Sequence, residues 1–299
     1  MDVVLALLAA LVFALGTVLL QKAGMAEPSG GSATGLLLRL ARRPVWLAGI
    51  AADGLGFVLQ AIALTIGRIA VVQPLLVASV VFALPLGARL TGQRVRRLDI
   101  GAALLVTVAL IAFLTIADPS GGRDDAPLVQ WLITGAAMAV VVVPLVVFAA
   151  GRSPSRKAAM LGVATGVLFA LTAALTKAAA DQVNDGVFEI FKHWHVYALI
   201  VVGYISMTLN QLALGTGALA PAIATSIGVD PIVSVVIGTT LFQESLHPAP
   251  LAIAATVASL LAALGGVAIL ARSQEGGAAV KPGSGSAAPP HRRRRPTGI

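Results

Sequence analysis

The 299-residue sequence contains no cysteine, few charged residues and few aromatic residues. Without cysteine the chain cannot form disulfides, thiolate metal sites or a cysteine nucleophile. Charged residues make up 11% of the chain, which is too little to cover the surface of a soluble globular protein. Aromatic residues, at 5%, are too scarce for the aromatic girdles of a transmembrane β-barrel.

Familiar enzyme motifs are also missing. The sequence has no G-x-x-x-x-G-K-[ST] phosphate loop, no H-E-x-x-H zinc motif and no G-x-S-x-G nucleophile elbow. The net charge of +8 comes from dispersed basic residues with no interleaved aromatics, so we expect no nucleic-acid partner. We therefore expect a protein that is not an enzyme and needs no cofactor.

Long apolar stretches make up most of the chain, in which 58% of residues are hydrophobic. Each is about 20 residues long, enough for a helix to cross a hydrocarbon core of about 30 Å. The sequence therefore predicts an all-α, polytopic membrane protein with about nine transmembrane helices. The predicted helices cover residues 2–21, 45–66, 70–90, 99–117, 128–150, 158–180, 196–216, 219–242 and 249–271.

Basic residues are concentrated in alternate connections between these helices. By the positive-inside rule, this distribution predicts an extracytoplasmic N-terminus and a cytoplasmic C-terminus in the cell membrane. The basic groups on the predicted cytoplasmic side are Lys22, Arg39, Arg42 and Arg43; Arg89, Arg94, Arg96 and Arg97; Arg152, Arg156 and Lys157; and Arg272, Lys281 and Arg292 to Arg295.

The spacing of the apolar stretches predicts two repeats. Residues 1–117 hold four helices and a cytoplasmic loop at 23–44, in which residues 36–43 suggest a short interfacial helix in contact with membrane lipid. Residues 118–157 carry a linking helix, and residues 158–271 hold four more helices. Because one helix separates the halves, they should have inverted topology, as in many secondary transporters. Residues 272–299 are rich in Gly, Pro and Ser and predict a disordered basic tail.

Several short runs resemble known transporters. Residues 43–49, with Gly56 and residues 71–75, resemble the first half of the NIPA magnesium-transporter family. Residues 241–246, with Gly265 and Gly266, look like the end of an EamA-type repeat. Both families belong to the drug/metabolite transporter superfamily, and the resemblance implies a transporter of a small solute or cation, with magnesium as one candidate.

The chain departs from the NIPA pattern at two acidic positions. Phe57 stands where that pattern has an acidic residue directly after the glycine matched by Gly56, and Gln93 stands at a second acidic position. The counterpart of Gln93 near the end of the eighth helix is acidic, as Glu244. A small organic metabolite or amine, suggested by the breadth of the superfamily, is therefore an alternative substrate to magnesium.

Two carboxylates lie well inside predicted spans, Asp53 in the second helix and Asp230 in the eighth. A charge at membrane depth is costly, so such a residue should face the bundle interior and bind a partner or a solute. The structural alternative is a protonated side chain hydrogen-bonded between helices. Pro231 follows Asp230 and frees a backbone carbonyl one turn earlier, which could form a binding notch.

Three amides, Gln60, Asn210 and Gln211, fall near the middle of the second and seventh helices and could donate to and accept from a polar solute. Their alternative role is hydrogen bonding between helices. The G-x-x-x-G spacing from Gly162 to Gly166 favours close helix packing, either within the chain or in a homodimer. We expect transport by alternating access, and a non-transporting membrane scaffold is the rival interpretation.

Overall fold

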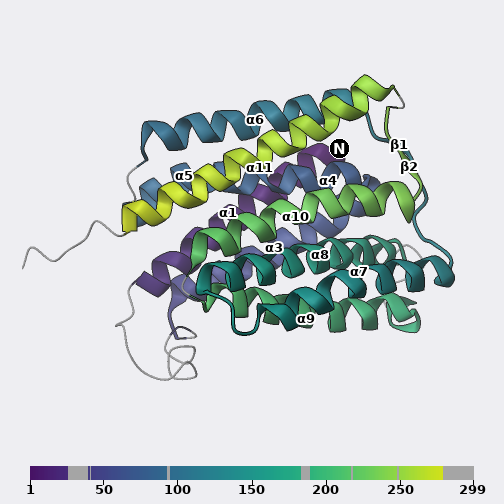
Figure 1. Cartoon of the computed structure of the whole chain (residues 1–299), viewed down its shortest axis with the longest axis horizontal. Coiled ribbons are helices and arrows are strands. Elements are labelled where there is room, and N and C mark those ends of the chain that lie inside the picture. The colour runs from purple at the N-terminus through teal and green to yellow at the C-terminus, as the bar shows by residue number, and fades with distance from the viewer. Residues whose placement is uncertain are drawn as a thin grey trace, which may run out of the picture.

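The computed structural model describes residues 1–25, 40, 42–92, 95–182, 189–216, 218–247 and 249–278, which form a bundle of long helices (Figure 1). Two short strands, β1 (Ser120–Gly121) and β2 (Glu244–Ser245), and a 3₁₀ turn, η2 (Glu189–Lys192), lie between helices. The helices are α1 (Asp2–Met25), α3 (Pro44–Ile66), α4 (Ile69–Leu76), α5 (Ala78–Thr91), α6 (Arg97–Ala117), α7 (Leu128–Ala149), α8 (Pro154–Asp181), α9 (Trp194–Leu214), α10 (Leu219–Thr240) and α11 (Pro250–Ala278).

The part of the chain that the structure describes contains nine helical segments long and apolar enough to cross a membrane. They agree with the nine predicted stretches to within a few residues at most ends, because the thickness of the hydrocarbon core fixes the length of a spanning helix. The chain is therefore an all-α, multi-pass membrane protein, as predicted.

The last helix is longer than predicted. We expected it to end at residue 271 and a disordered tail to begin at residue 272, but α11 continues to Ala278. Residues 279–299 lie outside the described residues, as do Gln93 and most of the predicted interfacial helix at 36–43.

The third span, Ile69–Thr91, is divided into α4 and α5 at Val77. Pro74 lies inside α4, three residues before the break, and its missing N–H leaves the carbonyl of Ala70 without a helical partner. At the break, the Val77 N–H bonds to the carbonyl of Pro74 at 3.2 Å, three residues back instead of four. The break lies about a third of the way along the span.

The two predicted repeats have corresponding helix contacts. In the first, α1 packs on α3, α4 and α5; in the second, α8 packs on α9 and α10. Contacts between α4 and α10, and between α6 and α11, join the two sets (Figure 1). The linking helix α7 packs mainly on α8. The division of the chain into two four-helix repeats and their inverted orientation both stay predictions.

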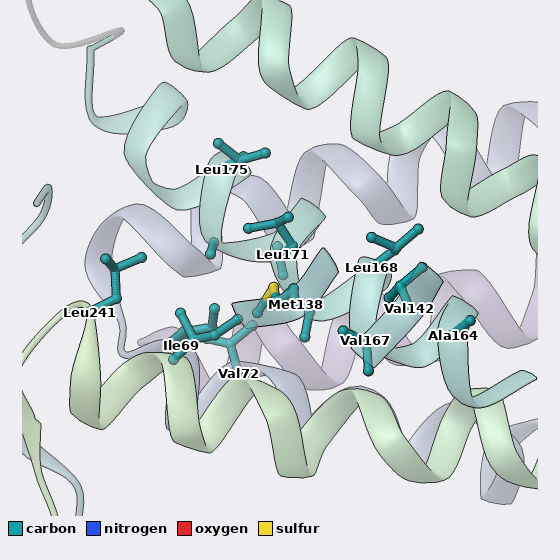
Figure 2. Close-up of a cluster of buried hydrophobic side chains, with 14 of the residues drawn as sticks. Ile69, Val72, Met138, Val142, Ala164, Val167, Leu168, Leu171, Leu175 and Leu241 are labelled. Atoms are coloured by element: carbon teal, nitrogen blue, oxygen red, sulfur yellow. The ribbon is translucent and has the colours of Figure 1, made fainter. Parts of the chain in front are cut away.

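The largest apolar core surrounds α8. Small residues on α8, such as Ala164 and Ala174, are fully buried and let neighbouring helices approach closely. Figure 2 shows side chains from α4, α7 and α8 and from the end of α10 in this core. Those labelled are Ile69, Val72, Met138, Val142, Ala164, Val167, Leu168, Leu171, Leu175 and Leu241.

The two ends of the bundle differ in charge. At one end, β1 pairs antiparallel with β2, with Ser120 opposite Ser245 and Gly121 opposite Glu244. The N-terminus lies at this same end, where Asp2 rests against Gly67 (Figure 1). The opposite end carries most of the basic residues, as the predicted topology requires. Those described there are Lys22, Arg42, Arg43, Arg89, Arg96, Arg97, Arg152, Arg156, Lys157 and Arg272.

Candidate functional site

A cavity of about 140 Å³ lies between the third span, α8 and α10. The break between α4 and α5 forms one wall, because its lining residues lie on both sides of that break. Half of the lining is apolar and half is polar. The lining residues are Gln73, Leu76, Val77, Ser79, Phe169, Ser226, Ile227 and Asp230.

Asp230 is the one charged side chain that the described part of the chain places on this cavity. It lies near the middle of the span Pro221–Thr240, where a bilayer offers its carboxyl group no water. Ser234, one turn along α10, donates a hydrogen bond to Asp230 Oδ1 at 3.1 Å. Pro231 has no N–H to offer the carbonyl of Ile227, which also lines the cavity. The site therefore concentrates acceptor oxygens.

Gln73 lies across the cavity on α4 and is 3% exposed. Its Nε2 is buried and has no hydrogen-bond partner among the described residues. A buried donor without a partner costs roughly 1–3 kcal/mol, so this amide is a ligand candidate. Gln73 was not predicted from the sequence as a site residue, because the opposite wall of the cavity comes from α8 and α10, in a distant part of the chain.

Close contact between α8 and α10 fixes the position of Asp230. A Cβ atom on Gly166 would lie 2.7 Å from the carbonyl oxygen of Ser226 and 3.1 Å from the backbone nitrogen of Asp230. Gly162 meets the side chain of Thr225 in the same way. The G-x-x-x-G spacing therefore serves packing within the chain.

The other predicted site residues lie apart from this cavity. Asp53, on α3, rests against Gly16 of α1, where a Cβ atom would collide with the Asp53 carboxylate. Gln60 on α3 and Asn210 and Gln211 on α9 are not among the cavity-lining residues. Of the five predicted site residues, the cavity thus includes Asp230 and adds Gln73.

A second polar cluster fastens the junction between α3 and α4. Glu244 accepts hydrogen bonds from the backbone N–H groups of Ile69 (2.8 Å) and Ala70 (3.0 Å), the first residues of α4. Lys177 donates to the carbonyl oxygens of Leu64 (3.1 Å) and Gly67 (2.8 Å), at the end of α3. An anion at a helix N-terminus and a cation at a C-terminus both complement the helix dipole.

Glu244 and Lys177 are both buried, and burial shifts the pKa of Glu244. Burial raises the pKa of Glu244, and it outweighs the lowering effects of the backbone N–H groups of Ala70 and Ile69 and of the nearby Lys177 and Arg68. Lys177 is 5% exposed and its Nζ lies 5.6 Å from the centre of the Phe242 ring. Lys177 is thus held inside the protein, where carbonyl groups at the end of α3 accept its hydrogen bonds.

Two arginines at this end also bond internally. Arg68 donates to the carbonyl of Gly121 at 3.0 Å, and Arg123 donates to the carbonyl of Leu241 and to the side chain of Gln130. These bonds account for arginines at the end of the bundle that the positive-inside rule predicts to be poor in them.

His195 lies in an aromatic cluster with Trp131 and Trp194. Asp125 Oδ1 accepts from Trp131 Nε1 at 2.9 Å and lies 3.2 Å from His195 Nε2. Across the described ranges, no three His, Cys, Asp or Glu side chains come close enough to share a metal ion. The cluster fastens the start of α9 to α7.

No family model and no solved structure matches the chain. Over 247 residues it is 31% identical to an uncharacterised protein of Corynebacterium glutamicum, and the match covers 82% of this chain and 86% of the other. The chain belongs to the same family as that protein. Because the match is this long, the two proteins share most of the membrane-spanning region. The description of the Corynebacterium protein assigns no activity.

Proposed function

We propose that this protein is a transporter of the drug/metabolite transporter superfamily that moves a small solute across the cell membrane by alternating access. The observation that carries the proposal is a carboxylate, Asp230, on a cavity near the middle of a span. Transporters of this kind bind solutes near the midplane, between repeats and beside interrupted helices. Here α4 meets α10 between the two sets of helices, and α4 is interrupted at Val77.

Two substrate classes fit a transporter of this superfamily. The resemblance to the NIPA family suggests a divalent cation such as magnesium, whereas the breadth of the superfamily suggests a small organic metabolite or amine. Orientation with the N-terminus outside and the C-terminus in the cytoplasm follows from the basic residues at one end of the bundle.

The rival proposal is a membrane scaffold. In a scaffold, polar side chains within the spans should lie in contacts between helices. Asp53 fits that expectation, because it packs between α3 and α1. Asp230 does not fit it, because it lines a cavity together with Gln73, whose Nε2 has no hydrogen-bond partner among the described residues. This pair favours transport over a scaffold.

The test uses the full chain in proteoliposomes, with uptake measured for Mg²⁺ and for a panel of small amines. Asp230→Asn keeps the volume of the side chain, so it should insert and melt like the unmodified protein but lose transport. The matched control is Asp118→Asn, at an exposed position with φ of 36° that asparagine also adopts readily. Unchanged transport in Asp230→Asn, or no transport of any solute by the unmodified protein, would contradict the proposal.

A further inference from the structure

We propose that the cavity binds a small organic cation that also carries a hydrogen-bond acceptor, as an amino alcohol does. This inference rests on the proposed transport function and names the chemistry of its substrate. It follows from three features of the cavity: a carboxylate and an aromatic ring in the same lining, an amide donor without a partner among the described residues, and apolar walls.

The first feature selects a cation. Asp230 is the charged group of the cavity, and the carbonyl of the lining residue Ile227 lacks the helical N–H that Pro231 cannot offer. Only one Asp230 oxygen is engaged by Ser234, so the carboxylate can still accept from an ammonium group. Phe169 contributes an aromatic ring to the same lining, and aromatic faces attract organic cations.

The second feature selects an acceptor on the same molecule. Gln73 is almost completely buried, and its Nε2 lacks a partner among the described residues. Because α4 and α10 pack against each other, Gln73 and Asp230 line one small space from opposite helices. A ligand whose ammonium group meets Asp230 and whose hydroxyl or carbonyl oxygen meets Gln73 would satisfy both groups.

The third feature disfavours a divalent metal ion. Mg²⁺ takes octahedral oxygen coordination and gives up water reluctantly. This cavity offers one carboxylate, and Leu76, Val77, Phe169 and Ile227 supply apolar walls that cannot bind a hydration shell. Its volume of about 140 Å³ is close to that of a cavity that holds benzene, so ligands of roughly four to seven heavy atoms should fit.

A pair of matched probes tests the inference. Ethanolamine and propylamine are both small primary ammonium ions with the same number of heavy atoms, but only ethanolamine carries a hydroxyl group. Binding of each probe, and of MgCl₂, to the purified full chain in lipid nanodiscs is measured by calorimetry at a pH where both amines are charged. The variants are Asp230→Asn and Gln73→Met, with Gln21→Met at the exposed end of α1 as control.

We expect the unmodified protein to bind ethanolamine roughly fivefold more tightly than propylamine, the worth of one hydrogen bond. Gln73→Met should abolish this preference while leaving the affinity for propylamine within twofold. Asp230→Asn should lower the affinity for both amines by about tenfold or more, since it removes the charge-assisted contact with the ammonium group. Gln21→Met should change neither affinity.

The outcomes separate this inference from the transport proposal. Binding and transport of Mg²⁺ through Asp230, without amine binding, would overturn the organic-cation inference and leave transport standing. Equal affinity for both amines in the unmodified protein would overturn the assignment of Gln73. If none of these solutes binds or moves, and Asp230→Asn behaves like the unmodified protein, both proposals are contradicted.

Discussion

Lys177 should be a major contributor to stability, and Lys177→Met tests this directly. The substitution keeps much of the side-chain volume but removes two hydrogen bonds, to the carbonyls of Leu64 and Gly67. A buried acceptor left without a donor costs about 1–3 kcal/mol, and Glu244 also loses a nearby cation. Methionine in turn avoids the cost of burying an ammonium group. We expect a net loss of about 2–4 kcal/mol in the free energy of unfolding.

Lys22 supplies the matched control, because it stands near the end of α1 as Lys177 does near the end of α8. Lys22 is exposed, so Lys22→Met should change stability by no more than about 0.5 kcal/mol. Unfolding is followed by the loss of helical circular dichroism as SDS is added to the protein in mixed micelles. Equal midpoints for Lys177→Met and the unmodified protein would refute the assignment of Lys177 as a helix-end clamp.

Three further predictions follow from the same structure. In intact cells, a membrane-impermeant thiol reagent should label Ala126→Cys and spare Ser153→Cys, and the reverse pattern would contradict the predicted orientation. Gly166→Ala should destabilise the protein by about 1–3 kcal/mol, because its methyl group would lie 2.7 Å from the Ser226 carbonyl, whereas Gly203→Ala, with open space around it, should not. Burial raises the pKa of Glu244 above its ordinary 4.5, so the folded protein binds that proton more tightly than the unfolded chain. The contribution of Glu244 to the free energy of unfolding should therefore fall as the pH rises from about 4.5 through the raised pKa. If a Glu244→Gln variant shows the same dependence of stability on pH, Glu244 is not its source.

Much of the fold could be predicted because a bilayer imposes length and composition on each helix. The nine predicted apolar stretches correspond to nine helical spans within the described residues. The end of α11 was missed because Gly, Pro and Ser content in the following residues indicated disorder, whereas the helix continues to Ala278. Local composition at a helix end is a weak signal where the chain leaves the membrane.

The site could be predicted only in part. Asp230 was identifiable because a carboxylate inside a span is costly wherever it lies. Gln73 and Lys177 were not, because their environment is made by other helices, α10 for Gln73 and the end of α3 for Lys177. Lys22 and Lys177 each follow a Phe-Ala-Leu run near the end of a long apolar helix, yet Lys22 is exposed and Lys177 is buried. Pattern alone cannot separate two such residues, since tertiary contacts decide between them.

The polar cluster of Lys177 and Glu244, which we call the clamp, lies on or against the helices that line the cavity. Glu244 binds the first turn of α4, and Gln73 lies one turn further along that helix. Lys177 and Phe169 are both on α8, and Gly238 of α10 packs against the Glu244 carboxylate. Close-packed helices leave little free space and transmit displacements to their neighbours, so loosening the contacts of Lys177 and Glu244 should shift α4 and the cavity wall that it forms. We therefore expect Lys177→Met to weaken binding of ethanolamine as well as stability, and unchanged affinity would show that the clamp and the cavity move independently.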